Sequence, residues 1–400
     1  MKLLLSSLTL LRAAAGAVAL AALLGVGCGG GGGVGSGGTG SFASGPITGF
    51  GSVIVNNVRF DDTAAAVEDG DGLRRSSSDL RLGMTVEIDS SAFITAGTDV
   101  SASASRIRFD SELRGPVTSI DVAGNAFSLL GQRVAVDSTT VFAEVPGALS
   151  TLAVGTVVEV FAVFDPVAER YRAKRVAQAA VGATTQVRGL VAHLDGAAQT
   201  LRLGIGSGSA TYSYAGATGV PTALAAGQFV RLRVAAAVLP SGLWQVRSFG
   251  TALQPLADAD GARVKGLITA FTSATGFSVN GRPVDATNAS FPDGRSGLAR
   301  GVRVEAEGSV RDGILRATKV SIESDKQESD RDFELRGPIE AVDTAARTIV
   351  LRGQTVSTAR GDLRYEGGVV GDLKKDRSVE VKGRLSSDGL RVEATRIKFE

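Results

Sequence analysis

Cysteine and histidine are almost missing from this 400-residue chain, which has one of each, Cys28 and His193. One cysteine cannot form an intrachain disulfide, so the chain must be stabilised by packing and by hydrogen bonds between strands. Zinc sites generally draw on several Cys or His ligands, and this pair is too small a set. We therefore expect no metal site and no bound cofactor.

Aromatic residues and net charge are also scarce. Aromatics make up 5% of the chain, and 43 basic residues stand against 41 acidic ones, a formal net charge of +2. This balance gives no reason to expect a polyanionic or polycationic partner. Proteins that bind single-stranded nucleic acid use a basic groove with stacking aromatic side chains. We expect no nucleic-acid partner.

Sustained helical periodicity is missing after residue 28, and so are long apolar runs. The chain is 44% hydrophobic and contains 52 glycines, enough apolar residues for a core and many positions for tight turns. Within later segments apolar and polar residues alternate, as in Ser52–Val55 and Phe277–Val279. Alternation with period two is typical of half-buried strands, so the composition favours an all-β chain with short strands.

The one long apolar run stands at the N-terminus, between Lys2 and Cys28. Its core, residues 13–26, has the length of a secretory h-region and is short for a bilayer span, which needs about 20 apolar residues. Small residues lead into Cys28, and this segment resembles the lipobox of bacterial lipoproteins. Gly25 stands where that family prefers Leu.

The lipobox resemblance implies that residues 1–27 are a signal peptide and that Cys28 is acylated, anchoring the protein to the membrane. Gly29 after the cysteine, in place of Asp, implies sorting to the outer membrane, facing the periplasm or the cell surface. The following residues, 28–45, are rich in Gly and Ser. Such chains are flexible coils, so we interpret them as a tether.

One module is repeated five times in the rest of the chain. A Gly followed by Pro or Leu and then Ile or Val, the first echo, recurs at intervals of about 70 to 77 residues. The first echoes begin at Gly45, Gly115, Gly189, Gly266 and Gly337. A second echo follows each, with the pattern of Leu80–Ile88. We expect five β-modules at residues 46–110, 111–181, 182–257, 258–325 and 326–400, with cuts tolerated near Ser111, Gly182, Asp258 and Lys326.

Each module is expected to hold five strands. Asn-Gly is the strongest short hairpin signal, because both turn residues need φ > 0; it occurs at Asn280-Gly281. We place equivalent turns at Asn56-Asn57, around Gly131-Gln132 and around Arg352-Gly353. The second-echo glycine is interpreted as a backbone requirement for the left-handed region, which Asp376 in module five tolerates. Those structural turn glycines are Gly83, Gly155, Gly227 and Gly301.

Five strands with a central hairpin and a long link before strand four fit a small closed barrel such as the OB-fold. A small β-sandwich is the alternative, because the sequence does not give the strand order. The combination of Gly-Pro-Ile, Val-x-Val-Asn-Gly and Leu-x-x-Gly-x-x-Val-Glu-Val resembles a bacterial family known as domain of unknown function 5666. The resemblance covers Phe42 to Glu400. It implies tandem OB-like modules on an exported lipoprotein, and it supplies no catalytic residues.

Candidate chemical groups each have a simpler structural explanation. His193 and Asp195 would share a strand face, as a general base and its orienting carboxylate do, but no nucleophile motif accompanies them, and a surface histidine is expected. Residues 68–72 resemble part of a calcium loop without its later ligands, so we expect a solvated loop. Residues 204–208 lack the lysine of a phosphate loop, and residues 323–332 are expected to be a polar linker.

Four glutamates recur at the same place in the second echo, and a carboxylate pair is what glycoside chemistry needs. Each stands between apolar residues, which favours an outward-facing strand position. These residues are Glu87, Glu159, Glu305 and Glu380, with Arg231 in the third module. We therefore expect no catalytic residues.

These features together favour a non-enzymatic lipoprotein of the cell envelope that binds or scaffolds an envelope protein or glycan through its repeated barrels. The alternative is an envelope enzyme acting on glycans, or an accessory subunit of one. A deep pocket with two facing carboxylates would favour the enzyme, and shallow polar barrel faces would favour the binding protein.

Overall fold

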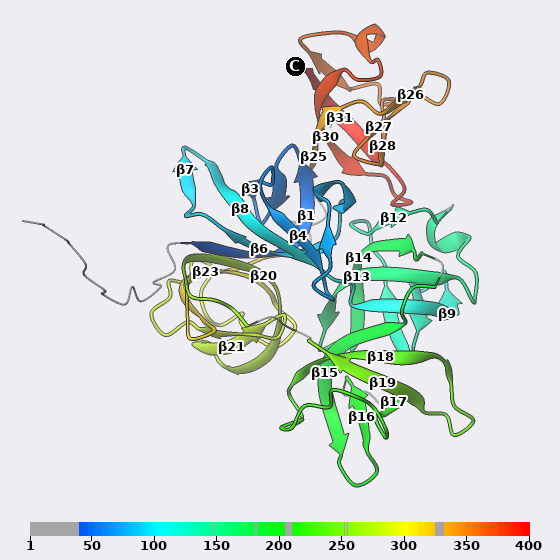
Figure 1. Cartoon of the computed structure of the whole chain (residues 1–400). Helices are drawn as coiled ribbons and strands as arrows, with labels where there is room; N and C mark the ends of the chain where they lie inside the picture. Colours follow the sequence, from blue (N-terminus) through cyan, green and yellow to red (C-terminus); the bar gives the residue numbers. More distant parts are fainter. Residues whose placement is uncertain are drawn as a thin grey trace, which may run out of the picture. The chain divides into compact units, whose positions relative to one another are not determined.

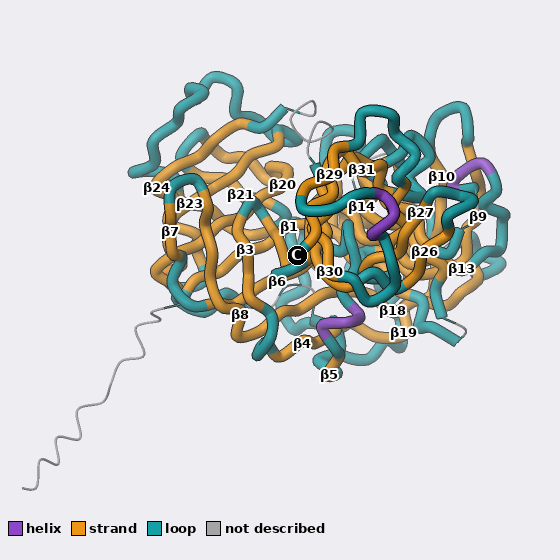
Figure 2. Tube along the Cα trace, turned by 90° about the horizontal axis from the view of Figure 1, so that it is seen from above, coloured by secondary structure: helices purple, strands orange, loops and turns teal. Residues whose placement is uncertain are grey.

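The computed structural model describes residues 40–145, 147–180, 182–204, 210–251, 253, 255–324 and 332–400. Cys28, the signal segment, most of the tether, residues 205–208 of the glycine run and most of the 323–332 segment lie outside the described residues, as does Lys326. Strands dominate the described residues, and helix is limited there to three short 3₁₀ turns (Figure 2). No helix among them is both long enough and apolar enough to span a bilayer.

The strands follow the five predicted repeats (Figure 1). Module 1 contains β1 (Ser41–Phe50), β2 (Val53–Val55), β3 (Val58–Asp61), β4 (Ala66–Asp69), β5 (Arg74–Arg75), β6 (Thr85–Ser90), β7 (Ile94–Ala96) and β8 (Asp99–Phe109). Module 2 contains β9 (Leu113–Asp121), β10 (Ala126–Leu129), β11 (Gln132–Ala135), β12 (Val141–Ala143), β13 (Val157–Asp165) and β14 (Arg170–Gln178). Module 3 contains β15 (Gln186–Asp195), β16 (Thr200–Leu203), β17 (Thr211–Ser213), β18 (Phe229–Val238) and β19 (Trp244–Gly250).

The last two modules repeat the pattern. Module 4 contains β20 (Ala259–Ser273), β21 (Gly276–Val279), β22 (Arg282–Asp285), β23 (Arg303–Arg311) and β24 (Ile314–Ile322). Module 5 contains β25 (Phe333–Pro338), β26 (Ala341–Asp343), β27 (Thr348–Leu351), β28 (Gln354–Ser357), β29 (Arg364–Glu366), β30 (Ser378–Leu385) and β31 (Val392–Phe399). The 3₁₀ turns are η1 (Ser77–Asp79), η2 (Ala148–Ser150) and η3 (Val370–Asp372).

All five modules close into a barrel with one strand order. In module 4 the antiparallel pairs β20–β21, β21–β22, β23–β24 and β20–β23 are completed by the parallel pair β22–β24. The same parallel pair recurs as β3–β8, β11–β14, β17–β19 and β28–β31. Strand three therefore pairs with strand five, and strand four returns to strand one. This is a small five-stranded OB-like barrel, so the all-β, tandem OB-like prediction is confirmed.

The central hairpins turn through two residues with positive φ, as a type I′ turn requires. The φ values are +52° and +61° at Asn56-Asn57, +49° and +80° at Asn280-Gly281, and +51° and +69° at Arg352-Gly353. In module 2 the predicted position is wrong by one residue, because the turn is Leu130-Gly131, with φ of +51° and +69°. Leu130 is fully buried, so packing outweighs its poor suitability for a left-handed conformation.

The apolar cores extend beyond single modules. One cluster joins buried residues of modules 1 and 5, with Val141 and Phe161 of module 2. A second runs through modules 2 and 3, and a third fills module 4 and takes in Phe42 of module 1. The repeats therefore share buried surface with copies that are distant in sequence.

Module 1 pairs directly with two of these distant copies. Residues 41–44 of β1 lie parallel to residues 261–264 of β20, and Gly49 and Phe50 lie parallel to Glu334 and Leu335 of β25. The strand thus begins at Ser41, within the segment interpreted from its composition as tether. Its Gly/Ser-rich residues form a strand because a neighbouring strand edge supplies hydrogen-bond partners.

Candidate functional site

The second-echo glycines lie at one repeated backbone contact. Their φ values are +80° at Gly83, +89° at Gly155, +85° at Gly227 and +84° at Gly301, with +67° at Asp376 in module 5. These values fall in the left-handed region, which residues with a β-carbon rarely adopt. All five residues therefore have the backbone conformation that a glycine, or a tolerant Asp, adopts at least cost.

These positions also connect the two echoes. The N–H of Gly83 donates to Ile47 O at 2.9 Å, and the N–H of Ile47 donates to Met84 O at 2.9 Å. The equivalent pair recurs in every module, with donor–acceptor distances of 2.8 Å to 3.0 Å. The acceptors of the glycine or aspartate N–H are Ile47, Val117, Val191, Ile268 and Ile339. The two echoes therefore form one structural contact that ties strand four to strand one.

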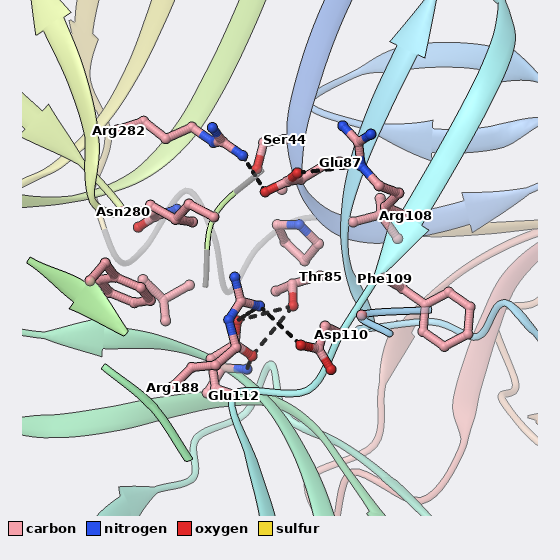
Figure 3. Close-up of a pocket in the computed structure, with 18 of the residues that line it drawn as sticks. Ser44, Thr85, Glu87, Arg108, Phe109, Asp110, Glu112, Arg188, Asn280 and Arg282 are labelled. Carbon is pink, nitrogen blue, oxygen red and sulfur yellow. Dashed lines mark hydrogen bonds and ion pairs between the residues drawn. The ribbon is translucent and has the colours of Figure 1, made fainter. Parts of the chain in front are cut away.

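A cavity of about 110 Å³ is lined by residues of modules 1, 2, 3 and 4. Figure 3 shows two groups of charged side chains that line it. In the first group Glu87 of β6 contacts Arg282 of β22 and lies 3.8 Å from Arg108 Nε of β8. The second group contains Thr85, Asp110, Glu112 and Arg188.

Glu112 stands at the centre of the second group, just before β9. Its Oε2 accepts a hydrogen bond from Ala162 N of β13 at 2.8 Å, and Thr85 Oγ1 lies 3.4 Å from the same oxygen. Arg188 Nη1 of β15 lies 3.8 Å from Glu112 and 3.9 Å from Asp110. One carboxyl group therefore contacts parts of modules 1, 2 and 3.

Burial raises the pKa of Glu112 to about 7, because the charged form loses its water. The charge of Arg188 and the bond from Ala162 N act in the opposite direction, and Asp110 adds to the rise. Near neutral pH this junction therefore contains a carboxyl group that is partly protonated.

The size of the cavity limits what it can hold. Pockets for drug-sized ligands have volumes of about 300–1,000 Å³, and this one has about 110 Å³. That volume accommodates several waters or a small ion, and the carboxylates around it contact arginines. Its charged side chains hold the modules to one another. The cavity residues Glu112 and Arg188 were not singled out from the sequence, where nothing distinguishes them from other charged residues.

The repeated glutamates lie on their predicted strands and face arginines of neighbouring strands. Arg114 Nε lies 3.1 Å from Glu159, and Arg396 Nη2 lies 2.6 Å from Glu380. Arg263 lies 3.9 Å from Glu305. In module 3 the charges are reversed, since Arg231 pairs with Asp110 at 3.0 Å and with Asp71 at 2.8 Å. These positions form ion pairs within and between modules.

His193 is exposed on β15, opposite Arg202 of β16. Asp195 does not orient it in this structure: Asp195 Oδ1 accepts from Ala198 N at 2.9 Å and closes the following turn. The structure thus places the histidine on a barrel surface and uses the carboxylate locally.

In the calcium-like segment at residues 68–72, the aspartate carboxylates interact with hydrogen-bond donors of the protein itself. Asp69 accepts from the N–H groups of Asp71 and Leu73 at 2.9 Å and 3.0 Å, and Asp71 pairs with Arg231 and Arg233 of module 3. A purely solvated loop is therefore the wrong description of this segment, because Asp71 contacts another module. Within the described ranges no group of three or more His, Cys, Asp or Glu is placed to hold a metal ion.

Three regions of the chain match a family model. Residues 114–177, 265–321 and 336–398 match "Domain of unknown function (DUF5666)". No curated protein matches the chain.

Two solved structures show weak similarity. One, "drosophila Unr CSD456", is 15% identical, with 53% of this chain and 97% of that chain covered and a TM-score of 0.15. The other, a multidomain protein with nucleic acid binding domains from Streptococcus pneumoniae, is 14% identical, with 58% and 76% covered and a TM-score of 0.16. With TM-scores this low, neither similarity supports an inference about ligand or partner.

Proposed function

From the match of three of the five modules to DUF5666, we propose that the protein is a non-enzymatic lipoprotein of the cell envelope. In this proposal Cys28 carries the lipid that anchors the chain to the outer membrane. The five OB-like barrels bind or scaffold an envelope protein or glycan. The N-terminal segment supports the location, because its apolar run ends in small residues and the only cysteine.

The observation that carries the binding role is the joining of the modules through module 1. Its β1 pairs with strands of modules 4 and 5. Arg59 Nη1 lies 2.6 Å from Glu334 of module 5, and Asp71 pairs with Arg231 of module 3. Barrels joined in this way present several separate surfaces on one anchored body, and several weak contacts on one body give avidity.

The repeated glutamates favour this role over glycan chemistry. A hydrolase needs two carboxyl groups set about 5–10 Å apart around a bound sugar, whereas the repeated glutamates contact arginines. The volume of the junction cavity is small for a sugar ring with its catalytic water. Neither observation favours an enzyme that acts on glycans. That alternative is therefore kept only as one outcome of the binding test below.

The location is tested with Cys28→Ser in the native host. We expect the wild-type protein in the outer-membrane fraction, with a mature N-terminal peptide whose mass includes a lipidated cysteine, and the variant in the soluble fraction. An unmodified chain that begins at another residue would contradict the proposal.

The binding role is tested with the purified chain from Gly29 onwards. We expect saturable binding to isolated envelope and no release of reducing ends from its glycans. Release of reducing ends that Glu87→Gln abolishes, and Arg133→Gln does not, would support the enzyme instead. Arg133 is a suitable control because its ion pair with Asp121 is exposed.

A further inference from the structure

Module 3 differs from the other modules in its charge. Between residues 182 and 257, Asp195 is the single acidic residue, and lysine does not occur. Five arginines stand in the same range: Arg188, Arg202, Arg231, Arg233 and Arg247. The near-zero charge of the whole chain therefore conceals one strongly basic module, which a sum over 400 residues cannot show.

Three of these arginines are used inside the molecule. Arg231 and Arg233 pair with Asp71, and Arg188 lies beside Glu112 and Asp110. Arg202 and Arg247 make no ion pair with any residue in the part of the chain that the structure describes. Their charges are left to interact with solvent or with a ligand.

Both arginines lie on one surface of the barrel, formed by strands two, three and five of the module. β17 pairs with β16 on one side and with β19 on the other, with Arg202 opposite Thr211 and Ser213 opposite Gln245. Leu201, Tyr212, Trp244 and Val246, which alternate with the polar residues of these strands, are buried. Figure 1 shows these strands in green, in one module.

We define the module 3 face as the outward residues His193, Thr200, Arg202, Thr211, Gln245 and Arg247. His193 and Arg247 are exposed, and the other four are half-buried. Gln245 is fixed across the strands, because its Nε2 donates to Ser213 O at 3.3 Å and to Ala215 O at 3.0 Å. The face combines guanidinium, imidazole, hydroxyl and amide groups, and β16, β17 and β19 contain no carboxylate.

We infer that the module 3 face binds an acidic polysaccharide. Guanidinium groups bind carboxylates with charge-assisted hydrogen bonds, and hydroxyl and amide groups suit the sugar hydroxyls between them. OB barrels bind oligosaccharides and oligonucleotides on the surface of strands two and three. This inference rests on the proposed function, since it names the ligand class of the same envelope-binding protein.

The aromatic residues favour a polysaccharide over a nucleic acid. Single-stranded nucleic acid is held largely by bases stacked on aromatic side chains. On these strands Tyr212, Tyr214 and Trp244 are buried in the barrel, and the outward positions of the module 3 face have none. A polyanion that offers carboxylates and hydroxyls, without a need for stacking, fits this surface better.

The test is a titration of the unlipidated chain, residues 29–400, with polygalacturonate, followed by calorimetry and by the fluorescence of Trp244. Trp244 is the only tryptophan and lies directly beside Gln245, so its emission reports on this module. We expect binding that weakens as salt is added, because exposed charges are screened. Neutral dextran is expected not to bind.

The variants are Arg202→Gln with Arg247→Gln, and Arg384→Gln as the control. Arg384 is an exposed arginine of module 5 that lies 3.3 Å from Asp332, so the control removes a charge without touching the face. We expect the double variant to bind polygalacturonate about tenfold more weakly, from two lost charge contacts of modest strength. The control should bind as the wild type does, and all three proteins should unfold at similar temperatures.

Three results would overturn the inference: no binding of polygalacturonate, equal binding by the double variant, or tighter binding of oligothymidylate than of polygalacturonate. The last would reassign the face to nucleic acid. If the face fails but the chain still binds isolated envelope, the proposed function stands without this ligand. If binding to envelope also fails, the proposed function fails with it.

Discussion

At the scale of single residues, Glu112 couples three modules through one carboxyl group. Asp110, Arg188, Thr85 and Ala162 N surround it. Its pKa in the folded chain is about 7, above the usual value of 4.5, because burial penalises the charge. The folded state therefore favours the protonated form, and the stabilisation is complete below about pH 4.5 and is lost as the pH rises through 7.

We expect Glu112→Gln to remove part of this pH dependence. Wild-type stability should fall between about pH 5 and pH 8 relative to the variant, by at most about 3 kcal/mol, the energy of the full shift. At pH 8 the variant should be the more stable protein. Urea unfolding across this pH range measures the difference, with Glu366→Gln, exposed on β29, as the control. Equal pH slopes for Glu112→Gln and wild type would refute the assignment.

The backbone conformation at each second-echo glycine, and the space around it, explain why glycine stands there. At Gly155 nothing lies within 4 Å of a built β-carbon, and φ is +89°, so a substitution there reports the backbone alone. At Gly301 a β-carbon would lie 2.5 Å from Val167, which adds a steric clash. The sequence predicted the conformational role of these residues, but only the structure separates the two positions.

We therefore expect Gly155→Val to destabilise the protein by about 1–3 kcal/mol, because a β-branched residue is strained in this region. Gly155→Asn should be close to neutral, since Asn tolerates the left-handed region. Thermal unfolding of the full chain compares the two variants. Equal stability would mean that the glycine has another purpose.

At the scale of elements, alternation and Asn-Gly turns predicted the strands and hairpins, whereas strand order was not predictable. In each barrel strand three pairs with strand five, and strand four returns to strand one. These pairings depend on contacts between residues that are far apart in the sequence. The module 2 turn was misplaced because Leu130 has no turn signal, and its conformation is determined by burial. Turn residues and alternation can therefore be recognised in a sequence, whereas the packing of side chains from distant strands cannot.

The first-echo glycine makes room for the hairpin. A β-carbon on Gly266 would lie 2.1 Å from Asn280 Nδ2. The Asn280 side chain bonds to both neighbours of that glycine, accepting from Leu267 N at 3.1 Å and donating to Lys265 O at 3.2 Å. Strand one and the hairpin turn are therefore fitted to each other.

We expect Gly266→Ala to destabilise module 4 by about 1–3 kcal/mol through overpacking. Asn280→Gly should lose the two side-chain bonds, and the double variant should be more stable than the sum of the single effects predicts, because removing the amide relieves the clash. Hydrogen exchange of β20–β24 measures all three. Additive effects would show that the two residues do not interact.

At the scale of the whole molecule, the ion pairs between modules were beyond sequence analysis, because Arg59 and Glu334 stand 275 residues apart. The basic character of module 3 is visible in the sequence of that module alone, because the charges of the other modules nearly cancel it in the whole chain. Ser111, Gly182 and Asp258 lie between the last strand of one barrel and the first strand of the next, and Lys326 lies outside the described residues. The cores of modules 1 and 5 form one cluster. Separability of the modules stays a prediction.

We expect residues 332–400 to fold alone into a strand-rich barrel, since they hold all five strands of the barrel and contribute many buried apolar residues to the core shared with module 1. The fragment should melt at a lower temperature than the full chain, because it loses the pairing of β25 with β1. Circular dichroism during heating tests this. An unfolded fragment would mean that the repeats are not domains.

β1 pairs with β20 and β25, and it is synthesised long before either of them. Synthesis delivers the chain from its N-terminus, at roughly 5–20 residues per second. The strand edge of β1 therefore emerges on the order of ten seconds or more before its partners. An open edge is a site of faulty association. Apart from Phe42, residues 41–45 at that edge are small, and glycine and alanine have weak strand propensity. We expect these residues to delay pairing until the later barrels are made.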